Sequence, residues 1–396
     1  MIRRPRTLLA AGLAALLLTS APLAAFDTNA RAAFVLDETT GTVLLSKNAD
    51  EPLPPASMSK LMTLYIAFEA VRDGRLQMDE KLPVSAHANS FGGSTLFLRE
   101  GERVSVEDLL RGIIVLSGND ACVVIAEALS PDGTEAGFAQ LMTQRAQQLG
   151  LTSSTFKNAS GWPAEGHLMS MRDLTLLAQR IIEDFPEFYE MFAEKEFLFD
   201  EEEAQNRYNR NPLLGLGIGA DGLKTGHTQE AGYGLVGSAK QGERRVIFSI
   251  TGLDSTQARA QESEAIVNWA FRQFAEKTVT RAGAVIAEAD VWMGAQGKVG
   301  LAAKEDVTLL LPNTPGRGVT AEVVYTGPIE APVTEGRQLA ELIISPEGLP
   351  EHRIPLFAAS SVPASGFVDR MMNVSQVLIG RLRPASAEVA PAEGAM

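Results

Sequence analysis

Apolar residues fall along the chain in patterns that predict short strands and amphipathic helices. The stretch 32–47 (AAFVLDETTGTVLLSK) is typical of two strands joined by the turn residues 39–41, and so predicts a hairpin. The pair Pro54-Pro55 ends any extended segment and favours a helix start, and apolar residues then recur at helical spacing over 61–70.

The middle of the chain continues as a mixture of helices and strands. Residues 106–129 predict helices interrupted near 117–120 by turn-forming residues, and 174–192 predicts another amphipathic helix. Strands at 233–240 and 244–251, with 222–228 leading into them, precede a helical pattern over 255–274. Together these elements predict an α+β domain from about 27 to 275, in which the early hairpin and the late strands share one antiparallel sheet flanked by helices.

The pattern changes after residue 275. Residues 276–358 hold short β-rich runs separated by glycine and proline turns, which predict a small all-β domain with no chemical constellation, suited to a spacer or protein-contact role. Segment 365–383 can form an amphipathic helix. Over 367–383 its apolar residues fall on one arc of that helix, and its arginines fall outside the arc. Such a helix can lie in a membrane interface or pack on the β-domain. The last segment, 384–396, is low in complexity and is expected to be disordered.

The N-terminus predicts export from the cytoplasm. Arg3, Arg4 and Arg6 precede an apolar run over 8–18, and small residues follow, so we interpret 1–25 as a removable secretory signal. The apolar run is short for a membrane span, and the alternative is a buried or amphipathic N-terminal helix. A signal peptide places the mature chain in the periplasm.

Composition disfavours nucleic-acid binding and functions that depend on a metal or cofactor. The 396 residues suffice for two or three domains, and the formal net charge of −14 makes nucleic acid an unfavourable partner. Cys122 is the one cysteine, lies in an apolar stretch and is best explained as a packing residue. The four histidines are scattered without a zinc-binding pattern, so neither a metal nor another cofactor is expected.

Candidate chemistry begins at Pro54 to Thr63 (PPASMSKLMT). Ser57 and Lys60 are three residues apart and share a helix face, as a nucleophile and its proton acceptor would. An ordinary helix start with a solvated lysine has the same spacing, and so does the stretch 154–157, where nothing nearby suggests a site. The spacing alone therefore leaves both interpretations open.

Two further motifs strengthen the catalytic interpretation. Ser117-Gly118-Asn119 is by itself most often a loop or helix cap, and Lys224-Thr225-Gly226 is most often a strand edge. However, Ser-x-x-Lys, Ser-x-Asn and Lys-Thr-Gly in this order are the signature of penicillin-binding proteins and class A β-lactamases. Three accidental matches would rarely fall in that order.

The segments PPASMSKLMT, SGNDA and DGLKTGHTQEAGYGLVGSA carry a closer resemblance. The chain resembles the low-molecular-mass penicillin-binding proteins that act as serine-type D-alanyl-D-alanine carboxypeptidases, over roughly residues 27–383. The resemblance implies a penicillin-binding/β-lactamase-like transpeptidase fold, followed by the β-domain and a terminal helix that rests on the membrane. One departure is Ser160-Gly161-Trp162, where many members have His-Gly-Leu, and it puts any role of that histidine in doubt.

The resemblance assigns roles to the motif residues. Ser57 is the expected nucleophile and Lys60 the base, acting as a neutral amine whose pKa is lowered by burial and by the charge of Lys224. Ser117, helped by Lys224, is expected to pass a proton to the leaving amine, and Asn119 to orient the substrate and lysines.

The remaining site residues are expected to bind substrate. The resemblance implies that the backbone N–H groups of Ser57 and His227 stabilise the oxyanion, and Gly226 leaves room for a backbone to approach. Thr225 and Arg259 are candidates for the terminal carboxylate. Arg259 could instead be an ordinary charge on a helix surface.

These expectations define one leading function and three alternatives. The leading hypothesis is removal of the terminal D-alanine from peptidoglycan stem pentapeptides through an acyl-Ser57 intermediate, with β-lactam antibiotics as covalent inhibitors. A β-lactamase is an alternative, although Glu165 to Met169 lacks the asparagine of the Glu-x-x-Leu-Asn loop. A D,D-endopeptidase of the same superfamily and a non-enzymatic wall-binding scaffold are the other two.

Overall fold

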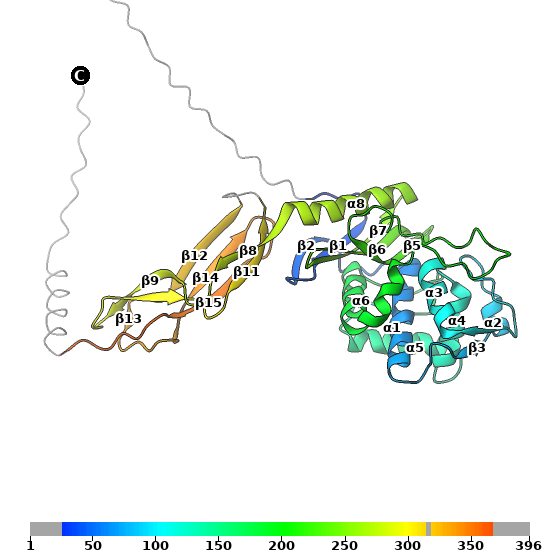
Figure 1. The fold of residues 1–396 in the computed structure, drawn as a ribbon, viewed down its shortest axis with the longest axis horizontal. Coiled ribbons are helices and arrows are strands. Elements are labelled where there is room, and N and C mark those ends of the chain that lie inside the picture. The colour runs from blue at the N-terminus through cyan, green and yellow to red at the C-terminus, as the bar shows by residue number, and fades with distance from the viewer. Residues whose placement is uncertain (1–25, 314–317, 367–396) are drawn as a thin grey trace, which may run out of the picture.

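The computed structural model describes residues 26–313 and 318–366, which form a mixed α/β part followed by an elongated β-rich part (Figure 1). The expected signal at 1–25 and the expected terminal helix at 367–383 lie outside the described residues. Within the ranges described, no helix is both long enough and apolar enough to cross a membrane.

The first part is built around an antiparallel five-stranded sheet with the strand order β2-β1-β7-β6-β5. The predicted hairpin and late strands therefore do share one sheet. The strands are β1 (Ala32–Asp37), β2 (Thr42–Lys47), β5 (Ala220–Thr228), β6 (Gly232–Gln241) and β7 (Arg244–Leu253).

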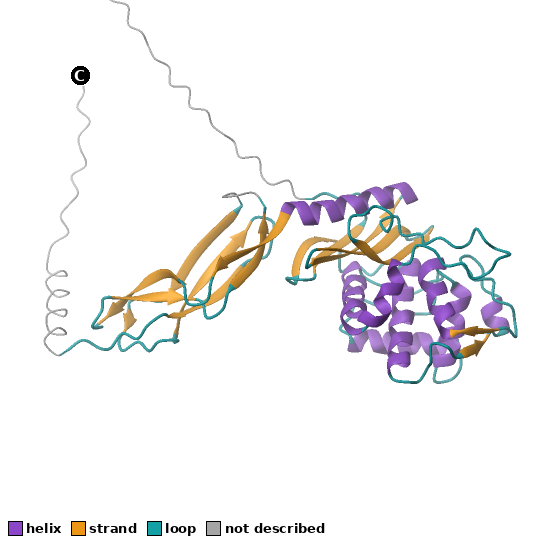
Figure 2. Cartoon of the chain, in the orientation of Figure 1, coloured by secondary structure: helices purple, strands orange, loops and turns teal. Residues whose placement is uncertain are grey.

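Side chains alternate between the two faces of this sheet along each strand, and both faces are covered and buried. On β1, Phe34 and Leu36 pack into the larger core with the helices of one face, whereas Ala33 and Val35 pack into a second core on the other face. Helix α6 packs against β1 and β7 in the larger core, and α8 covers β6 and β7 from the opposite side (Figure 2). The sheet is thus the middle layer of three.

The helical segments and the small strand pair of this domain surround the site described below. They are η1 (Ala56–Ser59), α1 (Lys60–Arg72), β3 (Lys81–Pro83), α2 (Ala86–Asn89), β4 (Arg103–Ser105), α3 (Val106–Arg111), the π-helical turn η2 (Gly112–Leu116), α4 (Asn119–Leu129), α5 (Glu135–Gln148), α6 (Met171–Asp184), α7 (Pro186–Tyr189), η3 (Glu190–Ala193) and α8 (Thr256–Gln273). The predicted interruption near 117–120 is confirmed, because η2 ends at Leu116 and α4 starts at Asn119.

The prediction of one helix over 174–192 is wrong. Helix α6 ends at Asp184, and Phe185 adopts non-helical angles of φ −132° and ψ 53°. Pro186 then begins α7, because proline disfavours helical angles at the residue before it and fits the first turn of a new helix.

The second part is all β, as its sequence predicts. It contains β8 (Phe274–Thr280), β9 (Val285–Trp292), β10 (Lys298–Ala302), β11 (Val307–Pro312), β12 (Val319–Tyr325), β13 (Ile329–Glu330), β14 (Gln338–Pro346) and β15 (His352–Ala358). Six of these strands form a sheet in the order β12-β14-β15-β10-β9-β13, while β11 pairs with β8. A separate apolar core lies inside this part, which helps it to keep its own shape.

Arg244 ties the central sheet to the joint between the two parts. Its Nε lies 2.5 Å from Asp37 Oδ2, and its two terminal nitrogens donate to the carbonyls of Ala270 and Phe274, where α8 runs into β8. The Asp37 side chain is fully buried and that of Arg244 is 11% exposed. The pair therefore lies largely out of water.

Replacing Arg244 by methionine is expected to lower the free energy of unfolding by about 3 kcal/mol, because it leaves a buried carboxylate without its cation. Urea unfolding measures this change. Arg353, which pairs with Glu341 and Glu351 at the surface, is the matched control, and its methionine variant should cost about 0.5 kcal/mol or less. Equal effects of the two substitutions would contradict the assigned role of Arg244.

Candidate active site

Ser57 lies in the short helical turn η1 that leads into α1. Ala56, with φ of +49°, turns the chain after Pro55, and the turn then presents Ser57 at the surface of a cleft while Met58, Ser59 and Lys60 are buried. The three-residue spacing between Ser57 and Lys60 does place their side chains together. Lys60 Nζ is 2.8 Å from Ser57 Oγ.

Lys60 is held by two further hydrogen bonds. Its Nζ lies 2.7 Å from Asn119 Oδ1 and 2.6 Å from the backbone carbonyl of Ser160, and both atoms can only accept. A neutral amine has two N–H donors and one lone pair. If the donors serve Asn119 and Ser160, the lone pair faces the Ser57 hydroxyl, which is the arrangement a proton acceptor needs.

Electrostatics favour that neutral amine. Burial lowers the pKa of Lys60 from 10.5 to about 8, and the positive charge of Arg210 adds to the decrease, while Asp120 opposes it. Burial also lowers the pKa of Lys224, and the charge of Lys60 is the next cause. The charge of Lys60 therefore makes it easier for Lys224 to lose a proton, whereas the positive charge that lowers the pKa of Lys60 is that of Arg210 and not, as expected, that of Lys224.

Ser117 and Asn119 are positioned by the break between η2 and α4. Ser117 adopts left-handed angles with φ of +63°, and this turn brings its hydroxyl within 2.9 Å of Lys224 Nζ. Asn119 begins α4, and its side-chain amide donates to the Gly92 carbonyl while its oxygen accepts from Lys60. The predicted Ser-x-Asn element thus joins both lysines.

Strand β5 brings Lys224, Thr225 and Gly226 to the cleft. Gly226 lies against η1, where an added Cβ would come within 3.0 Å of the Pro55 carbonyl, so a side chain at this position would push the strand away from Ser57. β5 is the edge strand of the sheet, which leaves some of its backbone groups free to pair with a bound chain.

A chamber of about 250 Å³ opens beside the nucleophile. It is lined by Ser57, Gly93, Ser94, Asn119, Gly161, Trp162, Pro163, His227 and Thr228. The His227 ring is exposed and stacks on Tyr233 with ring centroids 3.8 Å apart, so its position in the chamber is fixed by packing.

Arg259 is buried, and the alternative of an ordinary helix-surface charge is wrong. It is 7% exposed, its guanidinium lies over the Tyr233 ring, and one terminal nitrogen donates to the Arg210 carbonyl. Burial lowers the pKa of Arg259, and its Nε has no hydrogen-bond partner among the described residues. A buried cation with an unused donor next to the Tyr233–His227 stack is suited to an anionic ligand group.

Sequence reasoning missed three groups that shape the site. Arg210 comes from the irregular segment before β5 and contacts Ser94 Oγ at 2.5 Å, and no motif marks it. The Ser160 carbonyl holds Lys60 by backbone geometry alone. Asp120 accepts from the backbone N–H groups of Leu96 and Leu98, which fixes the wall of the cleft, and its position directly after Ser-Gly-Asn is the signal that could have identified it.

The second Ser-x-x-Lys spacing, at 154–157, is not a site. Ser154 is buried and donates its hydroxyl to Asp173, whereas the Lys157 side chain is exposed. Cys122 is buried as predicted, and burial raises its pKa to about 12. Within residues 26–313 and 318–366, no group of three or more His, Cys, Asp or Glu side chains is arranged to hold a metal ion.

Comparison with known proteins agrees with this geometry. A family profile described as D-alanyl-D-alanine carboxypeptidase matches residues 18–255, and one described as penicillin-binding protein 5, C-terminal domain, matches residues 274–364. The D-alanyl-D-alanine carboxypeptidase DacC of Escherichia coli K12 is 35% identical over 351 residues, which are 87% of this chain and 86% of DacC. DacF of Bacillus subtilis is 32% identical over 86% of this chain and 87% of its own length.

Solved structures give the same result. The D-alanyl-D-alanine carboxypeptidase DacD from Francisella tularensis matches with a TM-score of 0.73 and 28% identity, covering 86% of this chain and 95% of its own. Penicillin-binding protein 5 from Haemophilus influenzae matches with a TM-score of 0.66 and 31% identity, covering 85% and 98%. Fold and site define a penicillin-binding serine hydrolase. Within that class, the chain belongs to the D-alanyl-D-alanine carboxypeptidase family.

Proposed function

We infer that this chain is a serine-type D-alanyl-D-alanine carboxypeptidase that removes the terminal D-alanine from peptidoglycan stem pentapeptides. The observation that carries the inference is the environment of Lys60. Its amine has acceptors for two N–H groups and lies 2.8 Å from Ser57 Oγ, in a buried site that lowers its pKa to about 8.

The reaction begins at Ser57. Lys60 takes the hydroxyl proton while Ser57 Oγ forms a bond to the carbonyl carbon of the penultimate D-alanine. The carbonyl oxygen becomes an oxyanion, which the backbone N–H groups of Ser57 and His227 stabilise. This assignment is supported by the position of Ser57 at a helix start, where N–H groups lack intrahelical partners, and of His227 on the edge strand.

Collapse of the tetrahedral intermediate breaks the C–N bond to the last residue. Ser117, hydrogen-bonded to Lys224, gives its proton to the departing amine and takes one back from Lys224, while Lys60 holds the proton taken from Ser57. Thr225 and Arg259 hold the terminal carboxylate, with Arg210 beside them. Water then attacks the ester and gives a proton to Lys224, while Lys60 returns its proton to the departing Ser57 oxygen, which restores both lysines and frees the serine. A β-lactam acylates Ser57 by the same route, but its leaving group stays attached to the acyl chain.

The assay that tests this function is D-alanine release from a D-Ala-D-Ala pentapeptide, followed in parallel with the lifetime of a penicillin adduct. We expect D-alanine release together with a long-lived adduct. Absence of free D-alanine would refute the carboxypeptidase assignment. Rapid hydrolysis of bound penicillin would instead support a β-lactamase, and failure of penicillin labelling a non-enzymatic scaffold. Cleavage of cross-linked dimers would support an endopeptidase.

The proposal includes a location. The charged and apolar pattern of residues 1–25 supports export to the periplasm, where peptidoglycan is found. The amphipathic pattern of 367–383 supports peripheral contact with the outer face of the cytoplasmic membrane.

A further inference from the structure

The β-rich part ends, away from the α/β part, in three segments that we call the β-tip. These segments are residues 292–297, 326–333 and 361–366. Figure 1 shows β9, which runs into the first segment, and β13, which belongs to the second, at the end of the molecule opposite the α/β part. Any role of the β-tip is therefore separate from the chemistry at Ser57.

Backbone hydrogen bonds hold the three segments of the β-tip together. The Ala331 N–H donates to the Trp292 carbonyl at 3.0 Å, and the Ala295 N–H donates to the Pro363 carbonyl at 2.8 Å. The first bond joins the second segment to the first, and the other bond joins the first segment to the third. The β-tip is therefore one continuous surface.

The β-tip carries almost no charge. Glu330 is the one charged residue in its three segments, although charged residues make up 21% of the whole chain. Glycine, alanine, proline and valine supply most of the remainder. A surface that faces only water is usually richer in charge, so this composition points to contact with a less polar environment.

Trp292 gives the β-tip an exposed aromatic ring. It is the last residue of β9 and is 43% exposed, whereas the preceding Val291 is buried in the core of the β-rich part. Asp290 lies on the same face of β9, and Glu330 is the register partner of Trp292 on β13, so two carboxylates flank the indole. Carboxylates favour water, and tryptophan favours the headgroup layer of a membrane, where its ring meets apolar chains and its N–H meets polar groups. This combination suits the surface layer of a membrane and not its hydrocarbon interior.

The described part of the chain ends at the β-tip. The Ser365 N–H donates to the Met293 carbonyl at 2.8 Å, next to Trp292. Segment 367–383 begins two residues after Ser365, and two residues of chain span at most about 7 Å. The segment for which membrane contact is proposed above therefore starts beside Trp292, and it brings the β-tip to any surface that it binds.

We propose that the β-tip is a second membrane contact, in which the Trp292 indole enters the headgroup layer of the lipid surface that 367–383 binds. The proposal rests on the peripheral membrane contact proposed above and adds a residue to it. Once 367–383 is bound, insertion of Trp292 is an intramolecular step, so it adds affinity without a second loss of translational freedom. Two neighbouring contacts also restrict how the β-rich part can tilt relative to the membrane.

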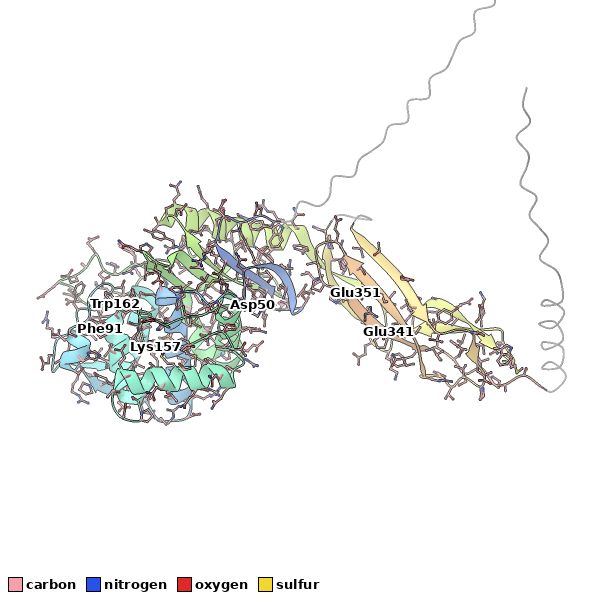
Figure 3. The ribbon with its side chains drawn as sticks, turned by 180° about the vertical axis from the view of Figure 1, so that it is seen from behind. Asp50, Phe91, Lys157, Trp162, Glu341 and Glu351 are labelled. Carbon is pink, nitrogen blue, oxygen red and sulfur yellow. The ribbon has the colours of Figure 1, made fainter. Side chains whose placement is uncertain are left out.

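Tryptophan quenching by brominated lipid tests the position of Trp292. The chain from residue 26 onward is mixed with phosphatidylethanolamine–phosphatidylglycerol vesicles whose acyl chains carry bromine near the headgroup. We expect the wild type to lose part of its tryptophan emission and Trp292→Phe to lose none. Trp162→Phe is the matched control and should keep the quenching, because Figure 3 shows Trp162 on the helical part, at the other end of the molecule.

Vesicle sedimentation measures the contribution of Trp292 to affinity. Trp292→Glu should weaken binding about tenfold, because it removes a large apolar contact and adds a carboxylate to those of Asp290 and Glu330. Val285→Glu is the matched control. It places the same charge on an exposed apolar residue at the other end of β9 and should bind as the wild type does.

The outcomes separate the two membrane contacts. Wild-type binding without quenching, or equal binding by Trp292→Glu and the wild type, would overturn the β-tip contact and leave the contact of 367–383 intact. Equal weakening by Trp292→Glu and Val285→Glu would also overturn it, because the effect would then come from charge alone. Absence of wild-type binding would overturn both contacts, while D-alanine release would still test the carboxypeptidase function.

Discussion

Replacing Ser57 by alanine is expected to eliminate both D-alanine release and penicillin labelling. The hydroxyl oxygen is the atom that forms the acyl bond, so its removal should lower kcat by about 10⁶-fold, to background. The fold should be retained, because Ser57 is only partly buried and alanine is tolerated in a helical turn. Mass spectrometry of the penicillin adduct, with peptide mapping, measures the result and locates the modified residue.

Ser59 provides the control for that experiment. It lies two positions away, is buried, and donates its hydroxyl to the Ala56 carbonyl instead of facing Lys60. Ser59→Ala should therefore keep labelling and D-alanine release. Labelling that persists in Ser57→Ala, or an adduct mapped to Ser59, would require a different nucleophile.

Replacing Lys60 by arginine is expected to give the second-largest effect. Arginine keeps the positive charge and the hydrogen-bond donors but cannot release its proton near neutral pH, so it cannot accept one from Ser57. Loss of general-base catalysis should lower the acylation rate by about 10² to 10⁴-fold. Stopped-flow measurement of penicillin acylation gives this rate directly.

Two companion variants separate chemistry from folding. Lys60→Met removes the amine at nearly constant size and should lose acylation to a similar extent. Lys81→Met removes an exposed lysine on β3 and should not change the rate. The base role of Lys60 would be untenable if the arginine variant acylated at the wild-type rate, with thermal unfolding confirming that each variant is folded.

Local sequence patterns were enough to predict much of the fold. Short apolar runs bounded by turn residues predicted the paired strands β1, β6 and β7, and the order of three short motifs predicted that Ser57, Ser117 and Lys224 serve one site. The helix predicted over 174–192 failed because periodicity was weighted above Pro186, whose ring ends a helix whatever the apolar pattern around it.

Other parts of the site depend on contacts between distant segments. Arg210 reaches Ser94 across 116 positions, and Lys60 finds the Ser160 carbonyl across 100 positions. Neither contact leaves a local pattern in the sequence. Arg259 was ambiguous for a related reason, since its exposure depends on whether Tyr233 covers it. The positive charge of an arginine shows that it can bind an anion. Only the fold shows whether that arginine is buried at the site or exposed at the surface.

The central claim is that Lys60 acts as a neutral base on Ser57, and the pH dependence of wild-type acylation by penicillin tests it most directly. Because the pKa of Lys60 is lowered to about 8, the neutral fraction rises as pH increases through that value. We predict a rate constant that grows about tenfold per pH unit below about pH 8 and levels off above it. A rate that is constant from about pH 6 to about pH 9, or that decreases across this range, would contradict the account.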